Sequence, residues 1–253
     1  MSDAVNEHEK IEALAAQIER SDLYTIVVEG KDDLLVYNEF EDIYEDPDCL
    51  VSVLAGGGRN TVLGIFNRLK DTPHINKTIF IVDKDTWVIT GIDSNYQHDR
   101  IICTNGYSFE NDIFIDGNLE NDMVKKNKEV FEEELPTVLK WFALEMHRIL
   151  DNRPTLHLAM QIDNLFNQAH IYTNPQAGET FPTSIHTQLQ TQYPHLLRGK
   201  TLLQFYKRVM NKREGFDKRD GYGMNATIEN VCKHKGACLN RIFEEVDKLI
   251  KAA

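Results

Sequence analysis

Short apolar runs alternate with longer amphipathic segments over the first part of the chain. The apolar runs are nearly continuous and rich in β-branched residues, which predicts buried strands. These predicted strands cover residues 24–28, 50–54, 78–82 and 100–104. Between them, apolar side chains recur at helical spacing, and the predicted helices cover residues 8–20, 32–40 and 59–70. Strands that alternate with helices predict an α/β fold, with a parallel sheet covered by helices on both faces.

The pattern changes after about residue 118, where the strand-like runs stop. Helical spacing then predicts a mostly helical C-terminal region, with helices over residues 125–150, 156–166, 197–210 and 226–251. Pro136 is expected to split or kink the first of these helices, and residues 169–196 are expected to be irregular. We therefore expect an α/β domain with an N-terminal helix over residues 1–118, followed by a helical domain or extension over residues 119–253.

Acidic residues follow three of the predicted strands. Their positions are Glu29, Asp32 and Asp33 after the first strand, Asp83 and Asp85 after the third, and Glu110 after the fourth. In open parallel sheets, functional groups gather at the carboxyl ends of the strands. If the first and third strands are neighbours, Glu29, Asp83 and Asp85 converge on one spot.

Carboxylates that converge need a partner, because two unit charges about 4 Å apart repel by about 4 kcal/mol at an effective dielectric constant near 20. A proton relieves this repulsion only by raising a pKa, whereas Mg²⁺ prefers carboxylate oxygens and water. Gly30 permits a sharp turn after the strand, and alternation places Asp83 and Asp85 on the same side of an extended chain. The simpler interpretation is a strand that ends in a polar turn.

These motifs resemble the signature of the toprim domain, which topoisomerases, bacterial primases and several nucleases share. The resemblance covers about residues 24 to 116 and rests on Glu29-Gly30 and the Asp83-Lys84-Asp85 pair, each after an apolar strand. "VVEGKDD" is closer to the overcoming-lysogenization nucleases. "YSFEN" (107–111) and "LLRGKTLLQFY" (196–206) resemble a toprim family that includes the effector subunit of the PARIS anti-phage defence system.

The resemblance implies a nuclease effector that depends on one or two Mg²⁺ or Mn²⁺ ions and hydrolyses phosphodiesters, with tRNA as the expected substrate. It also implies a homodimer when active, and an ATPase partner that holds the nuclease inactive until infection triggers it. The implied roles are Glu29 as acid/base or first metal ligand, Asp83 and Asp85 as metal ligands, Asp33 and Glu110 as ligands of a second metal, and Lys31 or Lys84 as the cation that neutralises the phosphate.

Two further segments offer groups for substrate binding. Gly57 and Gly58 lie between a predicted strand and helix, where successive N–H groups can cradle a phosphate beside Arg59; the alternative is a tight turn. "RGKT" imitates the end of a phosphate-binding loop without its first glycine, so the chain is not expected to be an ATPase. Arg198 and Lys200 in that segment are expected to contact substrate or to face solvent.

Cys232, His234 and Cys238 offer three zinc ligands with irregular spacing and no evident fourth, so whether they bind anything stays open. The formal net charge is −12, which argues against a general nucleic-acid coat. Four cysteines in 253 residues, together with no secretory signal and no long apolar run, predict a reduced cytoplasmic protein that does not contact a membrane.

Two other functions remain open. Haloacid-dehalogenase-like phosphatases also place Asp-x-Asp after an apolar strand, but the motif lies on their first strand and requires Thr or Val where this chain has Trp87. A non-catalytic regulator would use the acidic residues to bind a protein partner. Replacing Glu29 should disable a toprim nuclease and spare such a phosphatase.

Overall fold

The computed structural model describes residues 2–46, 49–155, 158–212 and 222–252. The chain forms two compact units. The first comprises Met1–Lys84, Ile92–Thr104 and Ala237–Ala253, and the second comprises Asp85–Gly91 and Asn105–Gly236. This division differs from a single boundary after residue 118, because the chain enters the second unit twice and returns to the first for its C-terminal helix.

The first unit is built on a parallel four-stranded sheet with the strand order β2-β1-β3-β4. The strands are β1 (Tyr24–Val28), β2 (Val51–Ala55), β3 (Thr78–Val82) and β4 (Ile101–Cys103). Ile26 pairs with Val53 on one side and with Ile79 on the other, so β1 and β3 are neighbours at the centre of the sheet. The predicted α/β fold is confirmed as a Rossmann-like sheet, and the carboxyl ends of β1 and β3 adjoin.

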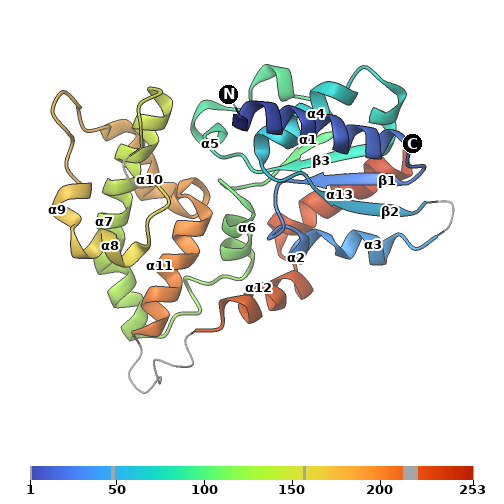
Figure 1. The fold of residues 1–253 in the computed structure, drawn as a ribbon. Helices are drawn as coiled ribbons and strands as arrows, with labels where there is room; N and C mark the ends of the chain where they lie inside the picture. Colours follow the sequence, from blue (N-terminus) through green and yellow to red (C-terminus); the bar gives the residue numbers. More distant parts are fainter. Residues whose placement is uncertain (1, 47–48, 156–157, 213–221, 253) are drawn as a thin grey trace. The chain divides into compact units, whose positions relative to one another are not determined.

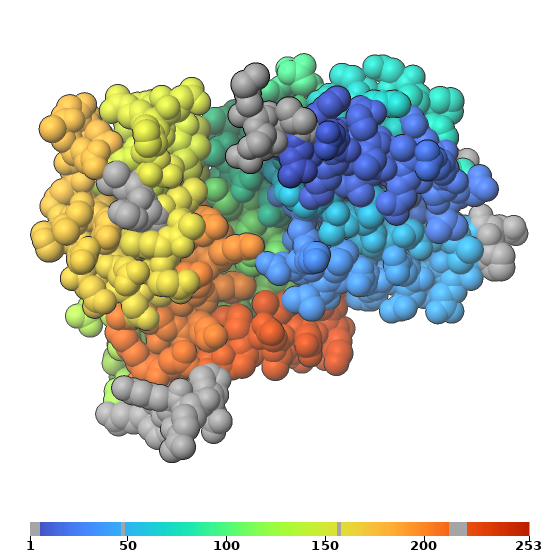
Figure 2. Space-filling model, in the orientation of Figure 1, coloured from blue at the N-terminus to red at the C-terminus, as the bar shows by residue number. Residues whose placement is uncertain are grey.

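Helices cover both faces of this sheet (Figure 1). The helices on one face are α1 (Ser2–Glu19) and α4 (Arg59–Leu69), and those on the other are α2 (Leu34–Tyr37), α3 (Glu39–Ile43) and α13 (Ala237–Lys251). Two short 3-10 helices, η1 (Pro73–Lys77) and η2 (Ser94–Tyr96), complete the unit. The dark-blue atoms of α1 form a continuous surface over its side of the unit (Figure 2).

Specific side chains hold these helices in place. A Cβ on Gly64 of α4 would lie 2.4 Å from Ile11 Cδ1, so the missing side chain lets α1 approach α4 closely. On the opposite face, Phe40 of α3 stacks on Phe243 of α13 with ring centroids 4.2 Å apart. Offset aromatic pairs of this kind add to the stabilisation that burial provides. The packing explains why α13 belongs to the sheet unit.

The second unit contains helices but no strand among its described residues. Its helices are α5 (Trp87–Thr90), α6 (Phe109–Asp116), α7 (Lys125–Leu150), α8 (Ile162–Asn167), α9 (Ala169–Tyr172), α10 (Thr183–Leu196), α11 (Gly199–Asn211) and α12 (Met224–Lys233). Phe131 of α7 stacks on Phe205 of α11 in its core, with centroids 4.6 Å apart. The predicted mostly helical C-terminal region is therefore confirmed. No described helix in the chain is long and apolar enough to cross a bilayer.

Three sequence expectations for these helices differ from the structure. Pro136 lies inside an unbroken α7. Residues 183–196, which the prolines led us to expect as irregular, form α10 with non-helical backbone at Gln192, two residues before Pro194, a deviation that fits the steric demand of the proline ring. The single helix expected over 226–251 is two helices, because the chain turns at residues 234–236, where a Cβ on Gly236 would lie 2.6 Å from Asp116.

Candidate active site at the carboxyl edge of the sheet

Glu29 and Asp83 lie side by side at the carboxyl ends of the two central strands. Glu29 follows β1 and Asp83 follows β3 directly, and the parallel pairing of these strands brings the two residues to the same edge. The Asp83 N–H donates to Glu29 Oε1 at 2.9 Å. The side chain of Glu29 is 15% exposed, so a carboxylate is held in a fixed place at an accessible edge of the sheet.

Arg59 connects the two strand ends. Its Nη1 donates to the backbone carbonyl of Asp83 and lies 3.9 Å from Glu29 Oε1. The guanidinium is 16% exposed, so its charge is only partly screened by water. Its charge offsets the negative charge of Glu29. The structure thus places Arg59, a predicted substrate-binding residue, beside two predicted catalytic residues.

The N–H groups of the glycine turn after β2 bind backbone carbonyls, whereas the sequence suggested that they could bind a phosphate. The Gly56 N–H donates to the Val28 carbonyl at 2.8 Å, and the N–H groups of Gly57 and Gly58 both donate to the Glu29 carbonyl at 2.7 Å. Gly57 and Gly58 have φ values of 87° and 126°, which favour glycine. Because these three donors already bind backbone carbonyls, the phosphate-cradle interpretation is not supported; the turn instead fixes the backbone of Glu29.

Two further cations at this edge were not found by sequence reasoning. Lys10 of α1 lies over the glycine turn, where a Cβ on Gly57 would be 1.8 Å from its Nζ. Arg241 of α13 donates from Nη2 to the Cys103 carbonyl at the end of β4, at 2.5 Å, and from Nη1 to Glu245 at 2.9 Å. A basic side chain from a helix therefore lies at the end of each of these strands: Lys10 at β2, Arg59 at β3 and Arg241 at β4.

The charges at this edge affect the pKa of the Cys103 thiol. Burial raises its pKa, and the nearby cations Arg59, Lys84 and Arg241 oppose that rise. Lys84 therefore contributes to the positive field at the edge, while its backbone N–H donates to Thr104 Oγ1 at 3.1 Å. Two of these cations lie beside carboxylates, Arg59 beside Glu29 and Arg241 beside Glu245.

The other predicted residues after β1 have different surroundings. Asp33 is 7% exposed, and its Oδ2 accepts the Gly30 N–H at 2.6 Å. This hydrogen bond closes the turn between β1 and α2, so a structural role for Asp33 is visible. Lys31 is exposed in that turn.

Asp85 belongs to the second compact unit, unlike Asp83. Its N–H donates to the Tyr107 carbonyl at 2.8 Å, and its φ is 47°. A residue other than glycine in this left-handed region is uncommon, and such backbone strain concentrates at functional sites. The expected extended chain through Asp83 and Asp85 is therefore not found, because β3 ends at Val82 and the backbone of Asp85 is left-handed.

Glu110, Arg198 and Lys200 come together in the second unit. Glu110 is 5% exposed, and Ser108 Oγ donates to its Oε2 at 2.5 Å. Burial raises the pKa of Glu110, while the hydrogen bond from Ser108 and the charges of Lys200 and Arg198 act in the opposite direction. Arg198 also donates to the Leu158 carbonyl at 3.3 Å.

The segments "YSFEN" and "LLRGK" pack directly against each other in this unit. Asn111 is fully buried, and its Nδ2 donates to the carbonyls of Pro194 and Leu197 at 2.7 and 2.8 Å. A Cβ on Gly199 would lie 2.2 Å from Ser108 Oγ, so only glycine allows this approach. Two motifs that are separated by more than 80 residues in the sequence thus form one contact.

Among the described residues, no group of three or more His, Cys, Asp or Glu side chains is arranged to hold a metal ion. The expected convergence of Glu29, Asp83 and Asp85 on one ion is therefore not found, and Asp85 belongs to a different compact unit from Glu29 and Asp83. Cys232 and His234 form no such group either, and Cys238 lies in the other compact unit. Magnesium sites commonly use one or two carboxylates together with water and substrate phosphates. Glu29 and Asp83 supply two carboxyl groups at adjoining strand ends, which is the number of protein ligands that such a site uses.

No protein-family profile matches the chain, and no curated protein matches it significantly.

Proposed function

We propose that this chain is a metal-dependent nuclease of the toprim type, which hydrolyses phosphodiester bonds in nucleic acid with Mg²⁺ or Mn²⁺. The observation that supports the proposal is the position of Glu29 and Asp83 at adjoining ends of the central strands, where the backbone N–H of Asp83 donates to Glu29 Oε1 at 2.9 Å. Carboxylates at the carboxyl edge of a parallel sheet are where such chemistry is expected.

The residues at the edge have complementary tasks in this reaction. A bound Mg²⁺ would neutralise phosphate charge and lower the pKa of water, with Glu29 and Asp83 as the residues that hold it. In this proposal Glu29 accepts the proton of the attacking water, whose oxygen forms a bond to phosphorus. The ester P–O bond breaks, and the leaving oxygen takes up a proton. Arg59, Lys10 and Arg241 bind the phosphates on either side.

The finer features of the proposal rest on the resemblance of the motifs. They are a role for Asp85 as a further metal ligand, tRNA as the substrate, a homodimeric active form, a cytoplasmic location, and an ATPase partner that restrains the nuclease until a phage infects the cell. The visible backbone contact of Asp33 and the burial of Glu110 favour structural roles for these two carboxyl groups over a second metal site.

The proposal is tested with the purified chain and four substrates: tRNA, ribosomal RNA, single-stranded DNA and double-stranded DNA. Cleavage is expected with Mg²⁺ or Mn²⁺, is expected to stop with EDTA, and is expected to fall at least about 100-fold in Glu29→Gln, as for loss of a general base. Glu133→Gln, an exposed carboxylate on α7, is the control with the same charge change and should cleave at the wild-type rate.

Each alternative function predicts a different result from the same experiment. A phosphatase would hydrolyse a phosphomonoester such as p-nitrophenyl phosphate and would keep that activity in Glu29→Gln. A non-catalytic regulator would cleave none of the four substrates with either metal. Cleavage that survives EDTA or the Glu29→Gln substitution would contradict the proposed roles of these groups.

A further inference from the structure

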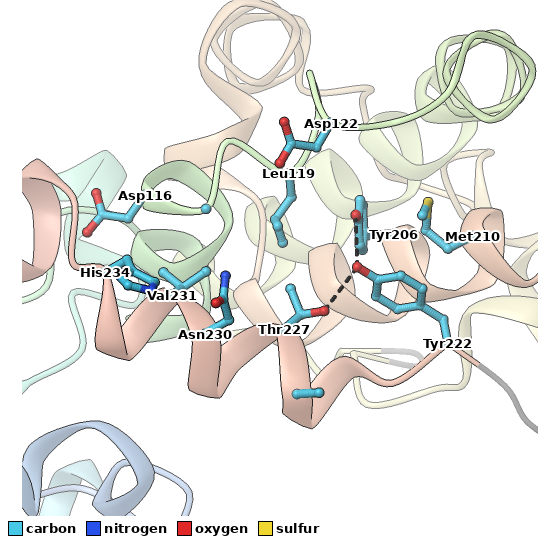
Figure 3. Close-up of a pocket in the computed structure, with 12 residues that line it drawn as sticks. Asp116, Leu119, Asp122, Tyr206, Met210, Tyr222, Thr227, Asn230, Val231 and His234 are labelled. Atoms are coloured by element: carbon cyan, nitrogen blue, oxygen red, sulfur yellow. Dashed lines mark hydrogen bonds between the residues drawn. The ribbon is translucent and has the colours of Figure 1, made fainter.

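The second unit contains a cavity of about 470 Å³ between α6, α11 and α12 (Figure 3). Several of its polar groups contact other parts of the protein. The Tyr222 hydroxyl accepts a hydrogen bond from Thr227 at 2.9 Å and lies 3.3 Å from the Tyr206 hydroxyl, and Asp116 packs against the turn at Gly236. Contacts within the chain account for these groups, so the lining does not define a class of ligand.

The lateral edges of the sheet in the first unit, formed by β2 and β4, have backbone groups that point away from the neighbouring strand. Along a strand, the backbone groups of successive residues point alternately to its two sides. The Tyr24 N–H donates to the Leu50 carbonyl, and the Gly56 N–H donates to the Val28 carbonyl. The even-numbered residues of β2 therefore face β1, and Val53 points its N–H outward from the sheet.

A carboxylate from α3 binds this outward N–H group. The Val53 N–H donates to Glu41 Oε1 at 2.7 Å. The helix that carries Glu41 is fixed on both sides of it, since Phe40 stacks on α13 and the Tyr44 hydroxyl donates to Asp247 at 2.7 Å. The carboxylate oxygen therefore lies where the carbonyl oxygen of a further strand would lie.

The opposite lateral edge has the matching contact. The Thr104 N–H donates to the Val82 carbonyl, so the carbonyl of the preceding residue, Cys103, points away from β3. Arg241 of α13 donates from Nη2 to this carbonyl at 2.5 Å. An outward donor at one edge and an outward acceptor at the other are thus each bound by a charged side chain from a helix.

An open edge strand is a template for pairing with another chain, and charged side chains at the edge are one way in which proteins prevent such pairing. Of the two edge strands, β4 has only three residues. β2 has five, with the apolar sequence VSVLA, and Leu50 just before it is 39% exposed. β2 is therefore the edge that is better suited to pairing.

We propose that Glu41 prevents edge-to-edge association of this protein, because its carboxylate occupies the Val53 N–H that a strand of a second copy would need. The helix α3 thus has a second task besides covering a face of the sheet. This inference is independent of the proposed nuclease activity, since Glu41 is not among the residues proposed for catalysis, metal binding or substrate binding.

Sedimentation velocity of the full-length protein over a range of concentrations tests the proposal. The weight-average sedimentation coefficient of Glu41→Ala should rise with concentration beyond that of the wild type. Glu41→Gln keeps an oxygen that can accept the Val53 N–H and should sediment like the wild type. Asp42→Ala removes the same charge from an exposed neighbouring position on α3 and should also sediment like the wild type.

Hydrogen exchange of the Val53 amide, followed by NMR at low protein concentration, is the second measurement. Exchange should be faster in Glu41→Ala by about three- to tenfold, as for the loss of one hydrogen bond, and unchanged in Asp42→Ala. This readout reports the bond itself, whether or not the copies associate.

Four outcomes would overturn the proposal. Glu41→Ala that sediments like the wild type at every concentration would show that the edge does not pair when it is open. Association of Glu41→Gln or of Asp42→Ala to the same extent as Glu41→Ala would show that net charge, and not the occupied N–H, controls association. An unchanged exchange rate of the Val53 amide in Glu41→Ala would show that the carboxylate does not bind this group in solution.

Discussion

Glu110 illustrates how a single buried carboxyl group couples stability to pH. Burial raises its pKa, so the folded state holds its proton to a higher pH than the unfolded chain, whose glutamates titrate near pH 4.3. Above that pH the unfolded state binds fewer protons than the folded state, and the free energy of unfolding falls as pH rises. The contribution of this group is therefore fully present in acid and lost toward neutral pH.

Glu110→Gln removes this ionisation while leaving an oxygen that can accept the hydrogen bond from Ser108. We expect the variant to have a higher melting temperature than the wild type at pH 8, with a difference that shrinks toward pH 4. Differential scanning calorimetry across this range measures it. A difference in melting temperature between the variant and the wild type that stays constant at all pH values would mean that the ionisation of Glu110 does not affect folding.

The sequence predicts individual site residues only where their position follows from local pattern. Glu29 and Asp83 could be paired because each follows a β-branched run, and the sheet then brings the two together. Lys10 and Arg241 could not, because each reaches the edge from a helix far away in the sequence. The hydrogen-bond acceptor of the Gly57 N–H group could not be predicted either, because the N–H groups of a glycine-rich turn can point toward solvent or toward backbone carbonyls.

At the scale of elements, a buried network of ion pairs connects α7 to the segment that precedes α10. Arg148 is 1% exposed, and it contacts Glu145 at 2.6 Å and Glu179 at 2.7 Å. The guanidinium lowers the pKa of Glu179 to about 2. Glu179 is bound through two oxygens, a geometry in which Arg and carboxylate are strongly paired.

Arg148→Met leaves two buried carboxylates without their cation and should lower the free energy of unfolding by about 3–5 kcal/mol. Urea denaturation monitored by circular dichroism measures this change. Arg153→Met removes an exposed ion pair with Asp151 and should cost at most about 1 kcal/mol. Equal effects of the two substitutions would contradict a special role for burial.

Helical periodicity predicted which elements exist better than it predicted where they end. The long amphipathic stretch of α7 was found over its full length, because its apolar positions repeat through Pro136. The helix α10 was missed because Pro182 and Pro194 suggested a loop, although one lies at its N-terminus and the other in its last turn. The break between α12 and α13 depends on the contact of Gly236 with Asp116, a tertiary feature that periodicity does not report.

On the scale of the whole molecule, the sheet unit needs α13 to be complete. Four of the apolar side chains of α13 are almost fully buried, namely Leu239, Ile242, Val246 and Ile250. Burial of each large aliphatic side chain contributes about 1.5–3 kcal/mol. Their sum, on the order of 6–12 kcal/mol, is as large as the net stability of a typical domain.

A chain that ends at Gly236 should therefore lose the folded sheet unit. We expect reduced cooperativity in thermal unfolding and increased binding of a hydrophobic dye, whereas a chain that ends at Lys251 should behave like the full sequence. Retention of a cooperative transition with the original enthalpy in the shorter chain would show that the sheet folds without this helix.

The placement of Arg241 on α13 also has a consequence for the order of events during translation. The ribosome makes β1 to β4 first, then all of residues 105–236, and only afterwards the helix that brings Arg241 to the end of β4. At about 5–20 residues per second, the nascent sheet waits on the order of ten seconds or more for its covering helix. The sheet unit therefore stays incomplete until the last helix of the chain has been translated.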